Sequence, residues 1–327
     1  MGKMREIEYI QAVTEALDEE MERDKDVFLI GEDIGPYGGV FGATKGLYRK
    51  YGPERVKQTP ISESAIIGSA MGAAITGLRP VAEIMYFDFI TLAVDQLVNQ
   101  AAKIYFMSGG QINVPMVVRT QYATGTTEAA QHSQNLETWF AHIPGLKVVM
   151  PCTAADVKGL LKSAIRDNNP VLFIENRVLY YKRFKMPEKV EPIPIGKADI
   201  KRPGKDITVI SAGMMVERAL EAAEEMAPGL DAEVIDLRTI HPVDMELIAG
   251  SVRKTGKVMI VHEAVTRFGW GAELVRNIVE QLFDFLDFPP RVLGNIGVPI
   301  PYSVPLEKAA VPQKDDIINN ISKMFKS

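Results

Sequence analysis

Residues 59–63, Thr-Pro-Ile-Ser-Glu, place the carboxyl of Glu63 in the first turn of an expected helix. Small residues recur in the next turns, at positions 65, 68, 69, 72 and 73. Close packing there would hold the carboxyl away from water, raise its proton affinity and let it share a proton with a ligand nitrogen. The ordinary alternative is an acid that balances the helix dipole, and the pattern alone favours that alternative.

A second polar segment, Gln-His-Ser-Gln at residues 131–134, follows a loop that contains Thr124, Gly125, Thr126 and Thr127. Polar clusters in loops after strands are where α/β proteins keep binding groups. Because histidine titrates near neutral pH, His132 could shuttle a proton. A solvated turn before a helix at residues 135–141 is the simpler interpretation, and the pattern favours it.

A third segment, residues 164–170, ends one helix and leads into a strand. Free carbonyls at a helix end, next to the side-chain oxygens of Asp167 and Asn169, are suitable ligands for a hard cation. An ordinary helix-to-strand turn explains the same residues and is favoured by the pattern.

Composition narrows the class of protein. The chain has 327 residues, of which 46% are hydrophobic and 24% charged, with a net charge of −5. These values exclude a disordered chain, and the lack of a basic run gives no sign of nucleic-acid binding. The longest weakly polar run has 14 residues, too short to cross a membrane. With a single cysteine, Cys152, and no signal-peptide pattern, we expect a cytoplasmic protein.

The elements that must position these segments alternate between strand and helix, which predicts a parallel sheet covered by helices. Prolines at positions 187, 192, 194 and 203 mark a domain connection, and a second alternating series follows it. Strands are expected at 27–30, 55–59, 81–84, 114–118, 146–150, 171–174, 207–211, 233–236, 258–261 and 291–293. Helices are expected at 7–23, 62–77 with Ser62 as N-cap, 91–107, 153–166, 214–226, 243–253 and 271–285.

Several motifs together resemble one family, the β subunits of the thiamine diphosphate-dependent decarboxylating component of 2-oxo acid dehydrogenase complexes. The resemblance covers nearly the whole chain. Within the family, the chain looks most like the acetoin and pyruvate branches. The matching segments are IGEDIG (30–35), TPISE (59–63), GLRPVAE (77–83), DQLVNQAAK (95–103), MSGG (107–110), QHSQ (131–134), PGLKVV (144–149) and VHEA (261–264).

This resemblance implies a transketolase-like α/β fold. A pyrimidine-binding domain is expected at 1–185, a linker at 186–204 and a smaller transketolase C-terminal domain at 205–327. It also implies an α2β2 heterotetramer with thiamine diphosphate between α and β. The chain lacks the Gly-Asp-Gly motif that usually holds the Mg-diphosphate, so an α subunit is expected to hold the magnesium.

The resemblance also assigns roles to single residues. It implies that Glu63 shares its proton with a pyrimidine ring nitrogen, that Phe89 stacks on that ring, and that Met85 contacts the cofactor nearby. It implies that His132 faces the reaction centre and assists proton transfer. A potassium site of some relatives matches five further residues, which are the Met116 carbonyl, Ala164, Ile165, Asp167 and Asn169.

The implied activity is that of an acetoin or pyruvate dehydrogenase. Such an enzyme cleaves a small-molecule substrate next to its carbonyl and passes the acyl group to lipoamide on a dihydrolipoyl acyltransferase core. The alternatives are a branched-chain 2-oxo acid dehydrogenase, half of a split transketolase or deoxyxylulose-phosphate synthase, and a non-catalytic scaffold subunit. A hydrophobic share of 46% is slightly rich for a soluble monomer. This surplus is expected at subunit interfaces, including helix 91–107 and the region of 262–264.

Overall fold

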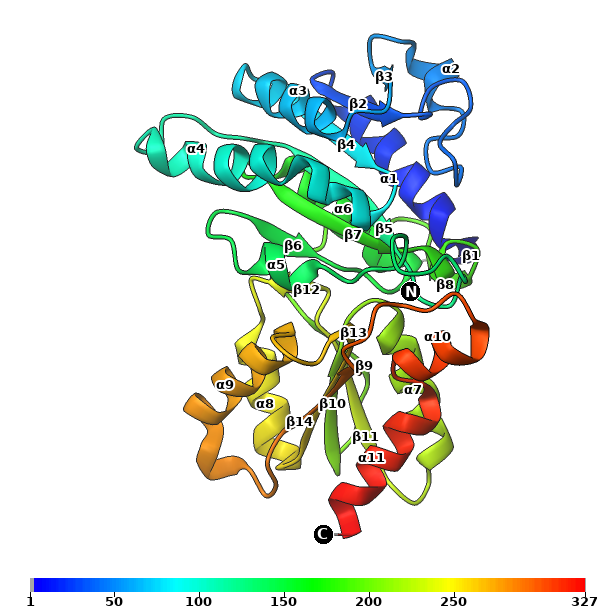
Figure 1. Ribbon diagram of the computed structural model, residues 1–327, viewed down its shortest axis with the longest axis vertical. Helices are drawn as coiled ribbons and strands as arrows, with labels where there is room; N and C mark the ends of the chain where they lie inside the picture. Colours follow the sequence, from blue (N-terminus) through cyan, green and yellow to red (C-terminus); the bar gives the residue numbers. More distant parts are fainter. Residues whose placement is uncertain (1–2, 327) are drawn as a thin grey trace. The chain divides into compact units, whose positions relative to one another are not determined.

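The computed structural model describes residues 3–326, and their contacts divide the chain into two compact units. The first unit ends at Tyr122 and resumes with residues 139–195, whereas the second combines residues 123–138 with the chain from Gly196 onward. The loop that carries His132 therefore packs with the second unit, although the sequence places it inside the N-terminal domain. Figure 1 traces the elements of each unit.

The first unit is built on a sheet in the order β6-β7-β5-β4-β2-β3, and every neighbouring pair in it is parallel. The strands are almost continuously buried because helices cover both faces of a parallel sheet. This confirms the predicted parallel sheet. The strands are β2 (Val27–Glu32), β3 (Val56–Thr59), β4 (Arg79–Ile84), β5 (Val117–Tyr122), β6 (Lys147–Val149) and β7 (Val171–Asn176).

Two helical layers pack on this sheet. In one layer, α1 (Tyr9–Arg23) and α6 (Ala154–Arg166) contact each other and the strands. The other contains α3 (Glu63–Ile75) and the continuous helical stretch that sequence analysis predicted as one helix at 91–107. That stretch is a 3-10 helix, η1 (Phe87–Ala93), then a π-helix, η2 (Asp95–Ala101), and only then α4 (Ala102–Met107). The spacing of apolar residues does not separate these helix types.

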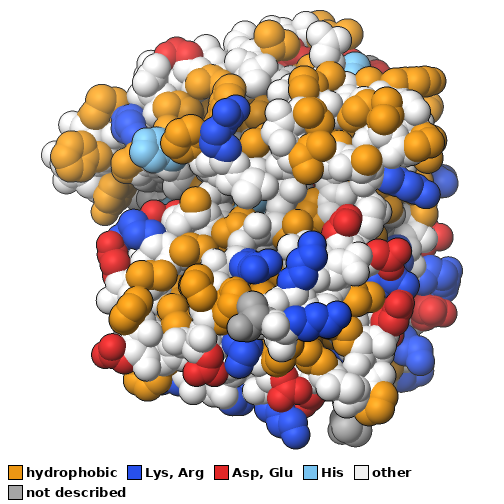
Figure 2. All heavy atoms as spheres, turned by 60° about the horizontal axis from the view of Figure 1, so that its bottom comes forward, with side chains coloured by type: hydrophobic (Ala, Val, Ile, Leu, Met, Phe, Trp, Pro, Cys, Tyr) orange, Lys and Arg blue, Asp and Glu red, His pale blue; other side chains and the backbone are white. Residues whose placement is uncertain are grey.

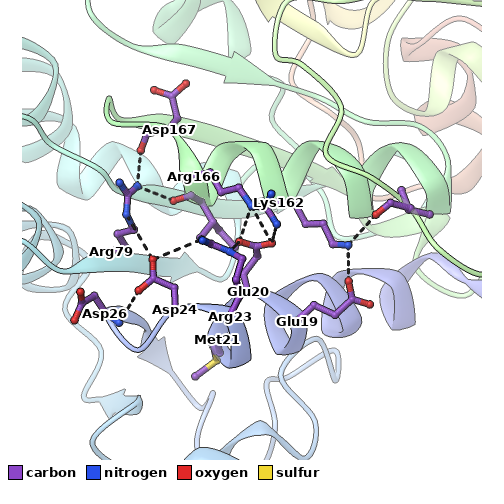
Figure 3. A network of polar contacts seen from close by, with 12 residues as sticks. Glu19, Glu20, Met21, Arg23, Asp24, Asp26, Arg79, Lys162, Arg166 and Asp167 are labelled. Atoms are coloured by element: carbon purple, nitrogen blue, oxygen red, sulfur yellow. Dashed lines mark hydrogen bonds and ion pairs between the residues drawn. The ribbon is translucent and has the colours of Figure 1, made fainter.

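Buried ion pairs join α1 to α6. The carboxylate of Glu20, 1% exposed, receives the guanidinium of Arg166 at 2.6 Å and that of Arg23 at 2.7 Å. The buried ammonium of Lys158 pairs with Glu19 at 2.7 Å. Figure 3 shows Glu19, Glu20 and Arg166 pointing toward the facing helix. Charges that leave water need such partners, so this seam fixes how the two helices face each other.

The second unit has its own sheet, in the order β14-β13-β10-β11-β9, parallel except for β9. Helices α8 and α9 cover one side, and α7 with α11 covers the other (Figure 1). The strands are β9 (Asp199–Arg202), β10 (Ile207–Ser211), β11 (Ala232–Asp236), β13 (Val258–Val265) and β14 (Arg291–Asn295). The helices are α7 (Met214–Met226), α8 (Met245–Thr255), α9 (Trp270–Leu282), η4 (Phe283–Phe285), α10 (Val304–Ala310) and α11 (Lys314–Lys326).

Several local predictions were wrong. The helix predicted from residue 7 begins at Tyr9, because Met4–Glu8 forms β1 and pairs antiparallel with β8 (Arg183–Pro187). The predicted linker 186–204 overlaps the end of β8 and contains β9 (Asp199–Arg202), and the partners of both strands lie far away in the sequence. The strand predicted at 114–118 lies at 117–122. Three further short elements and the last two helices were not predicted: α2 (Leu47–Tyr51), η3 (Arg177–Leu179), β12 (Thr239–His241), α10 and α11. The predicted helix 271–285 ends as η4.

The surface mixes charge signs. Figure 2 shows lysine and arginine side chains interspersed with aspartate and glutamate on the visible face, with hydrophobic side chains between them. Within residues 3–326, no helix is long and apolar enough to cross a membrane.

A buried arginine ties together three strands of the first sheet. Arg119 on β5 donates two parallel hydrogen bonds to Glu175 on β7, at 2.7 and 2.8 Å, and a third to Glu83 on β4 at 2.7 Å. The Tyr180 hydroxyl donates to the same Glu175 carboxylate at 2.8 Å. Burial raises the pKa of Glu83, and the nearby guanidinium opposes that rise. Bidentate pairing of this kind is strong and directional.

Replacing Arg119 by methionine should destabilise the first unit by about 3–5 kcal/mol, because two buried carboxylates lose their counter-charge. Urea unfolding of Arg119→Met measures the loss. As a matched control, Arg276→Met removes an exposed arginine that pairs with Glu273 and Glu280 on the surface of α9. Equal shifts of the unfolding midpoint in the two variants would contradict the role assigned to Arg119.

Candidate functional site

The predicted cofactor residues follow the carboxyl ends of β3 and β4, the two strands that flank β2. Glu32 at the end of β2 is in register with Thr59 on β3, and Gly31 is in register with Glu83 on β4. Helix α3 begins at Glu63, four residues after β3 ends, and packs on β4 and η1. Open α/β sheets bind ligands at this carboxyl edge.

Glu63 is the first residue of α3 and is half-buried. Ser62 occupies the N-cap position as predicted, but its side chain makes no capping hydrogen bond. Its backbone angles, φ −165° and ψ 85°, differ from the β-region geometry usual for a capping serine. The helix start was therefore predicted correctly, whereas the bond expected to stabilise it is absent.

Two carboxyl groups influence each other at this edge. Burial raises the pKa of Glu32, and the negative charges of Asp33 and Glu63 raise it further. Neighbouring carboxyls that disfavour double ionisation retain a proton more readily than isolated ones. The edge therefore brings a second acid close to Glu63, and the pKa of that acid, Glu32, is raised.

Aromatic side chains follow directly after β4. The half-buried Phe89 packs edge-on against Tyr86, with ring centroids 5.5 Å apart. The Tyr86 hydroxyl accepts a hydrogen bond from Arg177 at 3.0 Å, and that guanidinium also lies over the ring of Phe41, 5.3 Å from its centroid. These contacts fix Tyr86, which in turn supports Phe89. Met85, also half-buried, immediately precedes this group.

These residues fit a flat, nitrogen-containing ring such as a pyrimidine. Glu63 offers a carboxyl for a ring nitrogen, Phe89 an aromatic surface and Met85 a polarizable thioether. At the same edge, the buried hydroxyl oxygen of Thr59 has no hydrogen-bond partner among residues 3–326. A buried polar atom left unpaired in a polar edge is consistent with a ligand that completes its bonding.

His132 lies in the second unit, on the loop formed by residues 123–138. It is half-buried, and its main-chain N–H donates to the carbonyl of Ala129 at 3.3 Å. Thr127 and Ala129 both have left-handed backbone angles, with φ of 57° and 63°. For a β-branched threonine this costs on the order of 1–3 kcal/mol, so surrounding contacts must hold the loop in shape.

Two buried carboxylates from the second unit hold the start of this loop. Glu263 on β13 accepts a short hydrogen bond from the Thr124 hydroxyl. Glu307 on α10 accepts the main-chain N–H of Gly125 at 2.6 Å and that of Thr127 at 3.3 Å. Sequence analysis assigned neither acid to the loop. No sequence signal identifies Glu307, because its partners are main-chain amides about 180 positions away.

Trp270 of α9 holds the end of the loop. Its main-chain N–H donates to the Thr138 hydroxyl at 3.1 Å, and its indole N–H donates to Glu137 at 3.2 Å. Burial raises the pKa of Glu137 to about 7, the negative charge of Glu263 adds to the rise, and the indole hydrogen bond opposes it. Glu137 lies three residues after the Gln-His-Ser-Gln segment. That position was the only sequence signal that could have identified this acid.

The residues expected to form contacts with other subunits around 262–264 are core residues instead. His262 is 1% exposed and Glu263 is 2% exposed. The His262 Nδ1 atom lies 3.0 Å from the carbonyl of Ala264, and burial lowers the pKa of this histidine to about 4. A methyl group added at Gly271 or Gly294 would lie under 3 Å from the imidazole ring. Backbone packed this tightly encloses the ring, so these side chains cannot form a docking surface.

The predicted potassium loop is occupied by cationic side chains of the protein itself. The Arg79 guanidinium donates to the carbonyls of Ile165 and Asp167, each at 3.1 Å, and Figure 3 shows Arg79 beside Asp167. It also donates to the Asn168 side chain at 2.7 Å. Lys147 forms an ion pair with the Asp167 carboxylate. The helix end therefore does present oxygens to positive charge, as the sequence pattern suggested.

The remaining oxygens of this loop already accept hydrogen bonds. The Met116 carbonyl accepts from the Val171 N–H at 3.0 Å, and the Ala164 carbonyl accepts from the Asp167 N–H at 3.3 Å. Asn169 donates from its main chain to the Asp167 carboxylate at 2.9 Å. Each carbonyl has a second lone pair, so potassium ligation stays a prediction. No group of three or more histidine, cysteine or acidic side chains suited to a metal occurs in residues 3–326.

Comparison with known proteins matches this architecture. Residues 5–182 match the family model "Transketolase, pyrimidine binding domain", and residues 196–317 match "Transketolase, C-terminal domain". Among solved structures, "Split gene transketolase, inactive beta4 tetramer" superposes with a TM-score of 0.79 at 22% identity, covering 98% of both chains. The fold is therefore the two-domain fold of transketolase-like proteins.

Curated relatives narrow the family. The chain is 47% identical over 319 residues to "Pyruvate dehydrogenase E1 component subunit beta-2, mitochondrial" of Oryza sativa subsp. japonica, covering 96% of this chain and 85% of that one. It is 44% identical over 315 residues to "Pyruvate dehydrogenase E1 component subunit beta" of Rickettsia bellii, covering 96% and 97%. The chain belongs to the family of E1 β subunits of 2-oxo acid dehydrogenase complexes, as its motifs predicted.

Replacing Glu137 by glutamine should make the stability difference from the wild type depend on pH. The folded chain keeps the Glu137 proton up to about pH 7, whereas the unfolded chain releases it near the ordinary value of 4.5. Between these values folding takes up a proton, so this group lowers wild-type stability as pH rises. The free energy of unfolding of Glu137→Gln should therefore rise relative to that of the wild type from pH 4.5 to 7, by at most about 3 kcal/mol. Above pH 7 this difference should stay constant.

Urea unfolding at a series of pH values measures this difference. Buried His262 acts in the opposite direction below pH 6.5, but it contributes equally to both proteins and cancels in the difference. Glu224→Gln, which changes an exposed glutamate on α7, is the control. A difference that stays constant over the pH range would contradict the raised pKa of Glu137.

Proposed function

We propose that this chain is the β subunit of a thiamine diphosphate-dependent pyruvate or acetoin dehydrogenase. It would act with an α subunit in an α2β2 assembly and pass the acyl group to lipoamide on a dihydrolipoyl acyltransferase core. The observation that carries the proposal is the carboxyl edge of the first sheet. There the charge of Glu63 acts on Glu32, and Met85 and Phe89 follow the end of β4. Relatives 44–47% identical, all named pyruvate dehydrogenase E1 β subunits, support the same class.

The residues of this edge would bind the pyrimidine and manage one proton. Thiamine diphosphate, when bound, supplies an electron sink for cleavage of the bond next to a carbonyl. Glu63 would share a proton between its carboxyl and a ring nitrogen. Glu32 lies close enough to Glu63 for the two charges to interact. Phe89 would cover the ring face, and Met85 would fill space beside it and exclude water.

His132 would serve the second half of the reaction. An imidazole on a polar loop can give and take a proton at neutral pH. Acyl transfer to the sulfur of lipoamide needs such an exchange, because the sulfur loses a proton as it is acylated. We therefore assign His132 to acyl transfer, and Glu63 to the step that precedes it.

A second chain would complete the site. This chain has no Gly-Asp-Gly motif, so Asn168 and Asn169 lack the partner sequence that would hold a magnesium diphosphate. Its surface also offers large apolar side chains along η1 and α4, with Phe106 86% exposed. Exposed apolar groups of this size are typical of subunit interfaces. The others on this stretch are Leu92, Tyr105 and Met107.

Replacing Glu63 by glutamine should lower activity by about a hundredfold or more, because the amide cannot hold the shared proton. The assay is substrate-dependent dye reduction by the chain co-expressed with its α subunit. Glu54→Gln, an exposed acid at 90% side-chain exposure, is the control and should retain activity. Full activity of Glu63→Gln would favour a scaffold role.

The same assembly should turn over pyruvate or acetoin in a thiamine-dependent manner. Branched-chain 2-oxo acids and a sugar-phosphate aldehyde acceptor, assayed in parallel, separate the alternative enzymes. Preference for the sugar phosphate, with no lipoamide requirement, would indicate a split transketolase-type half. Absence of thiamine-dependent turnover on every substrate would overturn the proposed function.

A further inference from the structure

The second unit holds the His132 loop with an acid that has no cationic partner. Glu307 is 2% exposed, and its carboxylate accepts the N–H groups of Gly125 and Thr127. Among residues 3–326 no lysine or arginine forms an ion pair with it. Because its hydrogen bonds go to main-chain amides alone, the effect of this buried carboxylate is to hold the backbone of the loop.

We propose that Glu307 is a positioning residue for His132, acting through the main chain of residues 125–129. This inference rests on the proposed function, because it deepens the role given to His132 there. One carboxylate receives amides on both sides of Thr126, which forces the chain to turn around it. Thr127 and Ala129, both left-handed, lie within or directly after that turn and lead to His132.

Further contacts make the loop a segment held at both ends. The hydrogen bond from Thr124 to Glu263 fixes the residue just before the Glu307 contacts. At the far end, Trp270 donates to Glu137 and Thr138. His132 lies between these attachments, so its position depends on where they hold the main chain.

The charge of Glu307 matters to this arrangement. A carboxylate presents acceptors only, so both of its oxygens can face amide N–H groups. A glutamine of the same size keeps one acceptor but turns an NH2 group toward one of the amides. The strained turn then loses a charge-assisted hydrogen bond, and the loop gains freedom around His132.

The decisive experiment is a double-mutant cycle in the assembled α–β enzyme, comparing Glu307→Gln, His132→Gln and the double variant. Lipoamide-dependent turnover should fall by about tenfold or more in Glu307→Gln, and by a larger factor than dye reduction falls. In the His132→Gln background, the Glu307 substitution should change lipoamide-dependent turnover by less than about twofold. The exposed-acid control Glu224→Gln should keep both activities.

A second measurement follows the backbone directly and needs no activity. Hydrogen exchange should show slow exchange at the amides of Gly125 and Thr127 in the wild type, and faster exchange across residues 125–132 in Glu307→Gln. Thr124→Val, a milder change that removes the hydrogen bond to Glu263, should loosen the same segment to a smaller extent. It provides the same readout should Glu307→Gln fail to fold.

Three results would overturn the proposal. The first is wild-type lipoamide-dependent turnover in Glu307→Gln. The second is an equal loss with and without His132, which would make Glu307 a general structural residue. The third is fast wild-type exchange at Gly125 and Thr127. A wild-type enzyme without thiamine-dependent turnover would instead remove the proposed function, while hydrogen exchange would still decide whether Glu307 holds the loop.

Discussion

The buried Arg119 is the interaction on which the first unit depends. It joins β4, β5 and β7 through Glu83 and Glu175, and these side chains meet because Glu83, Arg119 and Phe173 lie in register on the three strands. The carboxyl edge that carries the candidate site can only be as well defined as that register. Because a buried ion cluster tolerates little displacement, it also makes this part of the sheet rigid.

Around Arg119, burial away from water requires the charges to be paired. Elsewhere, burial raises the pKa of carboxyl groups. At the edge of the first sheet, burial and the charge of Glu63 favour the protonated form of Glu32. In the second unit, burial does the same for Glu137. Each unit therefore contains a carboxyl whose pKa is raised by burial.

The loop of residues 123–138 belongs to the second unit, although it lies within the first domain in the sequence. It follows β5 of the first sheet, yet it packs with the second unit and is held by Glu263, Glu307 and Trp270. The second unit therefore holds the loop that carries His132 as well as its own core. Its strained residues, such as Thr127, keep their shape only while these contacts persist.

The sequence by itself determined the family, the parallel sheet and the positions of most helices, because these depend on local periodicity and on motifs contiguous in the chain. It placed Glu63 at a helix start and the His132 motif in a loop. Only the tertiary structure showed the β1–β8 pairing, the burial of His262 and the hydrogen bonds that Glu307 accepts from Gly125 and Thr127. Each of these depends on partners distant in the sequence, brought together by packing that no local pattern records.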